Sequence, residues 1–261
     1  MMKQSDIQLI IGIVREASAL MDRSGAFDVH DKGTLENIVT SSDLAVQHYL
    51  TRHLKEHFPE VGFLCEEEDL RDVSGHDAFW VIDPIDGTAN YARGSENCCI
   101  SVALVEKGES VLGIVYSPWR GELYTAEKGK GAFCNGKPLR VSRRPFSQGI
   151  LFTAMSTYHK EWAKTCSDIL YDVYMECNDV RRTGSAAIEL CLMASGYAEL
   201  YFEMRLMPWD YAAASLVLTE AGGAVCGLDG KAPSLSQPSM LLAANNRENC
   251  QRLLDFVRRH V

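Results

Sequence analysis

The chain has 261 residues, of which 46% are hydrophobic and 23% charged, a composition typical of a globular protein with a substantial core. Its formal net charge of −9 disfavours non-specific binding to nucleic acid and to anionic membrane surfaces, so we expect neither as a partner. Nine scattered cysteines without a Cys-x-x-Cys pair indicate buried thiols in a reducing compartment, and no apolar run approaches the ~18 residues of a membrane span. We therefore expect a cytoplasmic protein.

The first half of the chain is predicted to form two amphipathic helices and then mainly strands. The predicted helices lie at residues 4–22 and 41–58, and the predicted strands at 61–64, 79–82, 100–105, 111–116, 122–126 and 132–134. Asn135-Gly136 is typical of a tight hairpin turn after the last of these strands. Basic residues and a proline at 141–145 indicate a junction.

The second half alternates between strands and helices, which indicates layered α/β packing. The predicted strands lie at 150–154, 174–179, 198–203, 224–227 and 240–244, and the predicted helices at 159–172, 186–194, 211–221 and 246–259. We expect residues 1–261 to form a single catalytic unit, with an N-terminal α+β half of about 1–145 and a C-terminal α/β half of about 146–261.

Two aspartates at the end of the strand at 79–82 carry the strongest chemical signal. Asp83 and Asp86 lie three residues apart, and Pro84 holds Asp83 in an extended conformation. Gly87 and Thr88 then offer backbone N–H groups to an anion. Carboxylates that face an anion require cations between them, and Mg²⁺ prefers such oxygen ligands. A plain β-turn leaves Thr88 and the second aspartate unexplained, and the Asp-x-Asp-x-Thr pattern of aspartyl-phosphate phosphatases has a different spacing.

Other element ends also carry acidic or hydroxyl groups. Glu66 follows the strand at 61–64, whereas Asp43 and Asp210 begin helices and could serve there as N-caps. The Thr88 hydroxyl beside a carboxylate can pass a proton from metal-bound water, with Asp43 as the acceptor. The Gly184-Ser185-Ala186 stretch opens a helix, so its N–H groups could hold a hydroxyl or a phosphate.

Together these motifs resemble those of the inositol monophosphatase family, which are Mg²⁺-dependent, lithium-sensitive phosphatases. The matching stretches run in the family's order at residues 39–43, 66–67, 83–91, 131–136, 209–214 and 219–223. The resemblance implies an α/β fold, an alternating α-β-α-β-α sandwich of the inositol monophosphatase and fructose 1,6-bisphosphatase type. It also implies a homodimer.

The resemblance further implies two or three Mg²⁺ ions and a metal-activated water. The implied metal ligands are Glu66, Asp83, the Ile85 carbonyl, Asp86 and Asp210. Catalytic roles would fall to Glu66, Thr88 and Asp43. The implied substrate contacts are Asp86, Gly87, Thr88, Gly184, Ser185, Ala186, Glu203 and Asp210. Water would attack phosphorus while a second metal stabilises the leaving alkoxide.

Several positions depart from the family's pattern without removing a ligand. Cys65 stands in place of a common glycine, Asn37 in place of a frequent aspartate, and Met207-Pro208 lead unusually into the Trp-Asp pair. We place Lys32 on a loop that would close over the metals.

The predicted function is hydrolysis of inositol monophosphate to inositol and phosphate. The alternatives are a fructose 1,6-bisphosphatase, another sugar or nucleotide phosphatase of the superfamily, or a metal-binding module without catalysis. The residues after the Asp-Gly-Thr motif, Ala89-Asn90-Tyr91, disfavour a nucleotide substrate. The roles of Arg181 and Arg182 stay open between a phosphate and a subunit contact.

Overall fold

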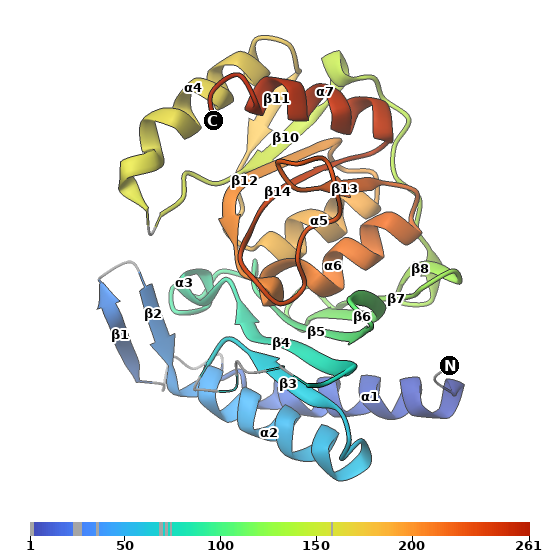
Figure 1. The fold of residues 1–261 in the computed structure, drawn as a ribbon. Helices are drawn as coiled ribbons and strands as arrows, with labels where there is room; N and C mark the ends of the chain where they lie inside the picture. The colour runs from blue at the N-terminus through green and yellow to red at the C-terminus, as the bar shows by residue number, and fades with distance from the viewer. Residues whose placement is uncertain are drawn as a thin grey trace.

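The protein, described from a computed structural model, folds into five stacked layers in which helices alternate with two β-sheets (Figure 1). The structure describes residues 3–22, 28–34, 37–67, 70, 73, 75–157 and 159–261. Within these ranges no helix combines the length and apolar character that crossing a bilayer requires. The predicted layered α/β sandwich is confirmed.

The first outer layer consists of α1 (Gln4–Ala17), extended by the 3₁₀ turn η1 (Ser18–Leu20), and α2 (Ser41–His57). Buried residues recur along α1 at helical spacing, namely Ile7, Ile10, Ile13, Val14 and Ala17. They pack with α2 against one face of the larger sheet, where Trp80 and Ile82 are fully buried. The apolar stripe of each helix therefore explains its place in the fold.

The larger sheet has seven strands and runs through the N-terminal half. In spatial order these are β3 (Gly62–Cys65), β4 (Ala78–Asp86), β5 (Cys99–Glu106), β6 (Glu109–Ser117), β7 (Glu122–Glu127), β8 (Gly131–Cys134) and β9 (Lys137–Pro138). β3 and β4 are parallel, and the remaining pairs are antiparallel. Asn135 and Gly136 both have positive φ between β8 and β9, so the predicted hairpin turn is confirmed.

Two helices fill the space between the sheets. α5 (Ala186–Ala194) and α6 (Pro208–Glu220) are buried on nearly all sides, consistent with their alanine-rich sequences. Small residues let α6 approach the sheet closely, since a Cβ built at Gly113 would lie 2.5 Å from the Ala213 carbonyl oxygen. The central layer thus tolerates little added volume.

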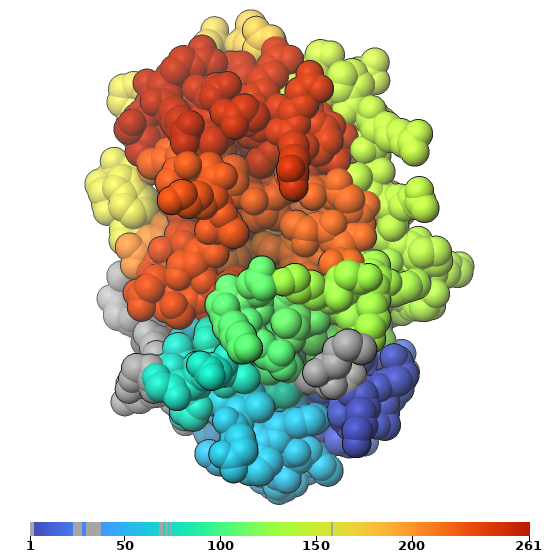
Figure 2. Space-filling model, turned by 45° about the vertical axis from the view of Figure 1, so that its right-hand side comes forward, coloured from blue at the N-terminus to red at the C-terminus, as the bar shows by residue number. Residues whose placement is uncertain are grey.

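The second sheet has five strands and is covered on its outer face by two helices. Its spatial order is β11 (Asp179–Arg181), β10 (Ile150–Thr153), β12 (Leu200–Leu206), β14 (Ser239–Ala244) and β13 (Ala224–Cys226), beneath α4 (Ala163–Tyr174) and α7 (Arg247–Val257). The short elements outside the layers are β1 (Val29–Thr34), β2 (Asn37–Thr40), α3 (Thr88–Tyr91), η2 (Phe146–Gln148) and η3 (Lys160–Trp162). Figure 2 shows the C-terminal residues stacked on the N-terminal ones.

Some predicted boundaries were wrong. The strand predicted near 174–179 forms later in the chain, as β11 from Asp179, because α4 continues through Tyr174. The antiparallel pair β1–β2 was not predicted. β4 continues through the aspartate motif to Asp86, and α6 begins at Pro208, a residue type well suited to a first helical turn.

Candidate active site

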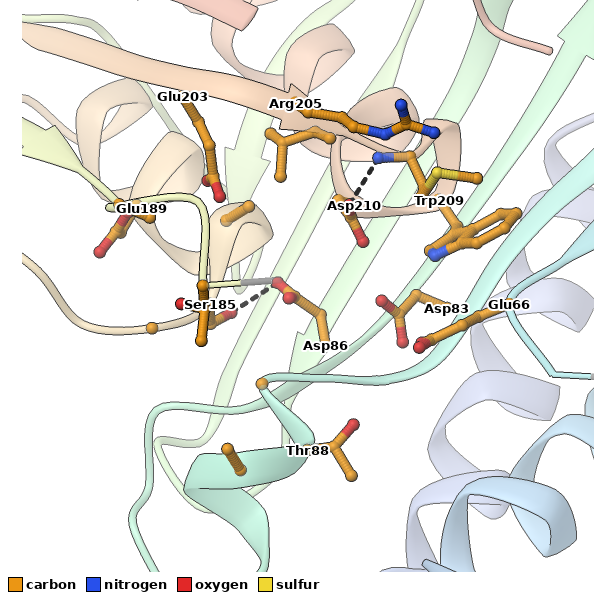
Figure 3. Close-up of a pocket in the computed structure, with 18 of the residues that line it drawn as sticks. Glu66, Asp83, Asp86, Thr88, Ser185, Glu189, Glu203, Arg205, Trp209 and Asp210 are labelled. Atoms are coloured by element: carbon orange, nitrogen blue, oxygen red, sulfur yellow. Dashed lines mark hydrogen bonds between the residues drawn. The ribbon is translucent and has the colours of Figure 1, made fainter. Parts of the chain in front are cut away.

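A cavity of about 410 Å³ lies where the end of β4 meets β12 and the first turns of α5 and α6. The predicted site residues that line it are Glu66, Asp83, Ile85, Asp86, Gly87, Thr88, Gly184, Ser185, Ala186, Glu203 and Asp210. They come from segments more than a hundred residues apart. Figure 3 shows seven of them arranged around one space, namely Glu66, Asp83, Asp86, Thr88, Ser185, Glu203 and Asp210. Asp43 is the one predicted site residue that does not line the cavity, and its side chain is fully buried.

The irregular end of β4 brings both aspartates to the cavity. In a regular strand, residues three apart point to opposite faces, but the pairing of β4 with β5 shifts register between Asp83 and Asp86. Pro84 lies in this interval and has no N–H group to donate to β5. The Asp83 carboxylate accepts the Ile85 N–H at 2.9 Å, which fixes its orientation.

The turn after Asp86 positions the proposed proton-transfer pair. Gly87 has a φ of 89°, and a Cβ there would lie 2.8 Å from the Asn97 carbonyl oxygen, so glycine is required. The Thr88 hydroxyl that follows lies 3.2 Å from Asp43 Oδ1 and 3.1 Å from the Ile85 carbonyl oxygen. Asp43 is fully buried and also accepts the Thr40 N–H at 2.8 Å. The predicted contact between Thr88 and Asp43 is therefore present.

Hydrogen bonds join the N-terminal wall of the cavity to its C-terminal wall. Ser185 caps α5 and donates its hydroxyl to Asp86 Oδ2 at 2.6 Å, and the Ala187 N–H donates to the same oxygen at 2.7 Å (Figure 3). The Asn90 side-chain amide donates to the carbonyl oxygens of Asn97 and Thr183, each at 2.7 Å. Asp86 and Asn90 thus hold the two halves of the site in register.

Asp210 lies in the first turn of α6 and not at its cap. The cap position is Met207, whose N–H donates to the Asp210 carboxylate at 2.7 Å. Ser101 of β5 donates to the Trp209 carbonyl at 3.2 Å and so fixes the start of α6 above the sheet. Asp43 likewise lies in the first turn of α2, behind the cap Thr40. Neither aspartate occupies the N-cap position, but each accepts the backbone N–H of the cap residue in a capping box, so a capping role is present for both.

Burial and mutual repulsion make the carboxylates of this cavity reluctant to ionise together. Burial raises the pKa of Asp83 well above its usual range, and the nearby Glu66, Asp86 and Asp210 raise it further. Burial also raises the pKa of Asp86, to about 6, although the hydrogen bonds from Ser185 and Ala187 oppose this. A cation among these groups would relieve both effects.

The donor set fits Mg²⁺, because four carboxylates and a main-chain carbonyl offer only the oxygen ligands that this ion prefers. Within the described ranges, however, no three His, Cys, Asp or Glu side chains already form a group that could hold a metal. The carboxylates therefore share one cavity without converging on a point, and their assignment as ligands stays a prediction.

Two further glutamates lie on the C-terminal side of the cavity. Glu203 was predicted there, accepts the Tyr201 hydroxyl at 2.7 Å, and has its pKa raised by burial to about 8. Glu189 was missed; it accepts the Thr183 N–H at 2.5 Å, and burial raises its pKa to about 7. An acidic residue inside the otherwise apolar helix at 186–194 was the signal that could have identified it.

The basic residues separate into those inside and outside the cavity. Arg182 and Arg205 line it, and Arg205 was not singled out from the sequence. Arg181 does not line it and instead forms an ion pair with Asp179 at 2.5 Å. Lys32 lies in β1, not in a loop, and its side chain, like that of Asn37, falls outside the part of the chain that the structure describes.

Comparisons with known proteins agree with the layered fold. Nus factor SuhB of Xylella fastidiosa is 40% identical over 189 residues, which cover 72% of this chain and 68% of that relative. The solved structure of extragenic suppressor protein suhB from Bartonella henselae has a TM-score of 0.89 at 28% identity, covering 99% of this chain and 100% of that chain. The structure of inositol monophosphate bound SaIMPase-II has a TM-score of 0.81 at 27% identity, covering 98% and 95%. The model of the inositol monophosphatase family, which is Mg²⁺-dependent, matches residues 3–261, and the chain belongs to this family.

Proposed function

We propose that this protein is a Mg²⁺-dependent phosphomonoesterase that hydrolyses inositol monophosphate. The observation that carries the proposal is the cavity in which Glu66, Asp83, Asp86 and Asp210 gather beside the Gly87–Thr88 turn. Asp83 and Asp86 are buried carboxylates of raised pKa next to backbone N–H groups, an arrangement that suits a phosphate bound through cations. The bound ligand of SaIMPase-II supports inositol monophosphate as the substrate.

Each side chain has a definite task in this proposal. The four carboxylates would hold Mg²⁺, which when bound neutralises charge on the phosphate and acidifies a water. Thr88 lies within 3.2 Å of Asp43 and would pass the water's proton to it. The N–H groups of Gly87 and Thr88 would orient the phosphate.

The alcohol part of the substrate would lie against the C-terminal wall. Glu203 and Asp210 would accept hydrogen bonds from its hydroxyl groups, and Gly184, Ser185 and Ala186 would contact it from the start of α5. Phosphoryl transfer depends mainly on such positioning and on charge neutralisation, so no covalent nucleophile is required.

We also infer a homodimer, a cytoplasmic location and suppression by lithium, which rest on the family. The curated relatives bear the name Nus factor SuhB, which does not itself denote a phosphatase. Hydrolysis is therefore the first property to establish.

The test is phosphate release from inositol 1-phosphate with and without Mg²⁺ and Li⁺. We expect turnover that requires Mg²⁺, falls on adding Li⁺, and disappears in Asp83→Asn. The matched control is Asp168→Asn on the exposed face of α4, which should keep full activity. Turnover of Asp83→Asn at the wild-type rate, or no release by the folded wild-type protein, would refute the proposal.

A further inference from the structure

The C-terminal wall of the cavity carries two guanidinium groups, and inositol monophosphate has no second anionic group that could bind to them. Arg182 and Arg205 both line the same cavity as the carboxylates. Arg205 projects from β12 on the side formed by Glu203 and Asp210, across from Glu66 and Asp83 (Figure 3). The phosphate of an inositol monophosphate would be neutralised on the metal side, and the rest of that molecule is uncharged.

Arg205 is not bound to the acidic residues around it. Among the residues that the structure describes, no carboxylate oxygen lies within 4.0 Å of its guanidinium group, and the group makes no hydrogen bond. A guanidinium group has five N–H donors in a planar fork that matches phosphate and carboxylate oxygens. All five are therefore available to a ligand in this cavity.

Arg182 is held at the cavity in a different way. Its guanidinium group donates to the Thr157 hydroxyl at 2.9 Å. Its charge also partly offsets the rise that burial causes in the pKa of Glu203. One bond to Thr157 leaves most of its donors unused. The neighbouring Arg181 directs its charge away from the cavity, to Asp179.

We propose that Arg205, assisted by Arg182, binds a second anionic group of the substrate, a phosphate or a carboxylate, beyond the phosphate that is cleaved. This inference rests on the proposed phosphatase chemistry and adds a preferred class of substrates to inositol monophosphate, namely polyol or sugar phosphates that carry a further negative charge. Arg205 is then a specificity-determining residue, because a fork of charge-assisted hydrogen bonds discriminates between substrates with and without that group.

The experiment compares substrates that differ only in the second group. Fructose 1,6-bisphosphate is paired with fructose 1-phosphate for a phosphate, and 6-phosphogluconate with sorbitol 6-phosphate for a carboxylate. We expect wild-type kcat/KM to favour the doubly charged member of at least one pair about tenfold or more, the contribution of one charge-assisted hydrogen bond. The favoured pair identifies the anion.

The variants then test the residue. Arg205→Gln should reduce that ratio to near one, whereas Arg181→Gln removes the same charge outside the cavity and should leave it unchanged. A wild-type ratio near one in both pairs, or a ratio that Arg205→Gln does not alter, overturns the proposal. Arg205 is exposed, so we expect the variant to fold, which far-UV circular dichroism checks.

A binding measurement separates this inference from the proposed function. The background is Asp43→Asn, which keeps the carboxylates that would bind metal. Calorimetry with Mg²⁺ measures the affinity of this variant for both compounds of each pair. The same measurement on the double variant that also carries Arg205→Gln shows what Arg205 contributes. Tighter binding of the doubly charged compound that depends on Arg205 supports the subsite even if no substrate is hydrolysed. Hydrolysis of inositol 1-phosphate together with binding that is indifferent to Arg205 refutes the subsite and leaves the phosphatase proposal standing.

Discussion

Replacing Asp86 with asparagine should abolish activity and yet stabilise the protein in the absence of divalent metal. Asp86 is buried and accepts the Ser185 hydroxyl and the Ala187 N–H through a single oxygen, Oδ2. An asparagine side chain can present its carbonyl oxygen to the same two donors while carrying no charge. The substitution therefore removes the cost of ionising a buried group but keeps its hydrogen bonds.

The size and the pH dependence of this effect follow from the pKa of Asp86, which burial raises from 3.8 to about 6. At about 1.4 kcal/mol for each pKa unit, ionised Asp86 costs the folded protein about 3 kcal/mol. Well below pH 4 the carboxyl is protonated in both the folded and the unfolded states, so Asp86→Asn has little effect on stability there. As pH rises through about 6 the wild-type protein loses this stability, and the variant does not.

Urea unfolding in the presence of a chelator, at pH 4 and pH 8, measures the difference. We expect a difference of less than about 1 kcal/mol at pH 4 and a variant more stable by about 3 kcal/mol at pH 8, or about 6–12 °C in Tm. Asp168→Asn, an exposed substitution of the same kind on α4, should change stability by less than about 0.5 kcal/mol. With excess Mg²⁺ the wild-type protein should gain stability that the variant does not. A variant less stable than wild type at pH 8 in chelator would refute the reasoning.

Substitutions of Thr88, Gly113 and Asn90, with matched controls for the first two, test separate parts of the structure. Thr88→Ala should reduce kcat by about 10²–10⁴-fold, while Thr88→Ser should retain much of it, because a hydroxyl near Asp43 suffices for proton transfer. Gly113→Ala should destabilise the fold by about 1–3 kcal/mol, since its Cβ would meet the Ala213 carbonyl oxygen; Gly12→Ala, in an open position of α1, should instead stabilise it slightly, as denaturant unfolding will show. Asn90→Ala leaves two carbonyls unpaired and should cost about 1–3 kcal/mol while lowering kcat/KM; an unchanged kcat/KM would contradict its bridging role.

Helix caps, turns and apolar periodicity in the sequence located most of the helices and strands. Elements without such a pattern were missed. The helix at 186–194 was predicted with its observed bounds because Gly184 and Ser185 form a turn and a cap before an apolar run. The pair β1–β2 was missed because residues 29–34 are mostly polar and do not alternate. The strand predicted near 174–179 was placed too early because Tyr174 belongs to α4.

The site was predictable as far as its residues lie in compact motifs. Asp83 and Asp86 stand together in the sequence, and the structure places both in one cavity with Asp210. Glu189 was marked only by its acidic side chain in an otherwise apolar helix, and Arg205 reaches the cavity through the packing of β12, which no spacing in the sequence reveals. Tertiary contacts of this kind become visible only in the folded chain.

The layered arrangement of the site places the residues for metal binding and the residues for recognition of the alcohol on different sheets, so the two properties can be changed independently. Glu66 follows β3 and both aspartates, Asp83 and Asp86, lie in β4, so these ligands belong to the seven-stranded sheet. Glu203 and Arg205 belong to β12 of the five-stranded sheet. Random substitution confined to β12 and the loop at 154–157 should therefore yield enzymes that accept new alcohols with their dependence on metal intact. Libraries in the loop around Gly87 should yield mostly inactive proteins. Such a fold can diversify its substrates while its hydrolytic chemistry is inherited unchanged.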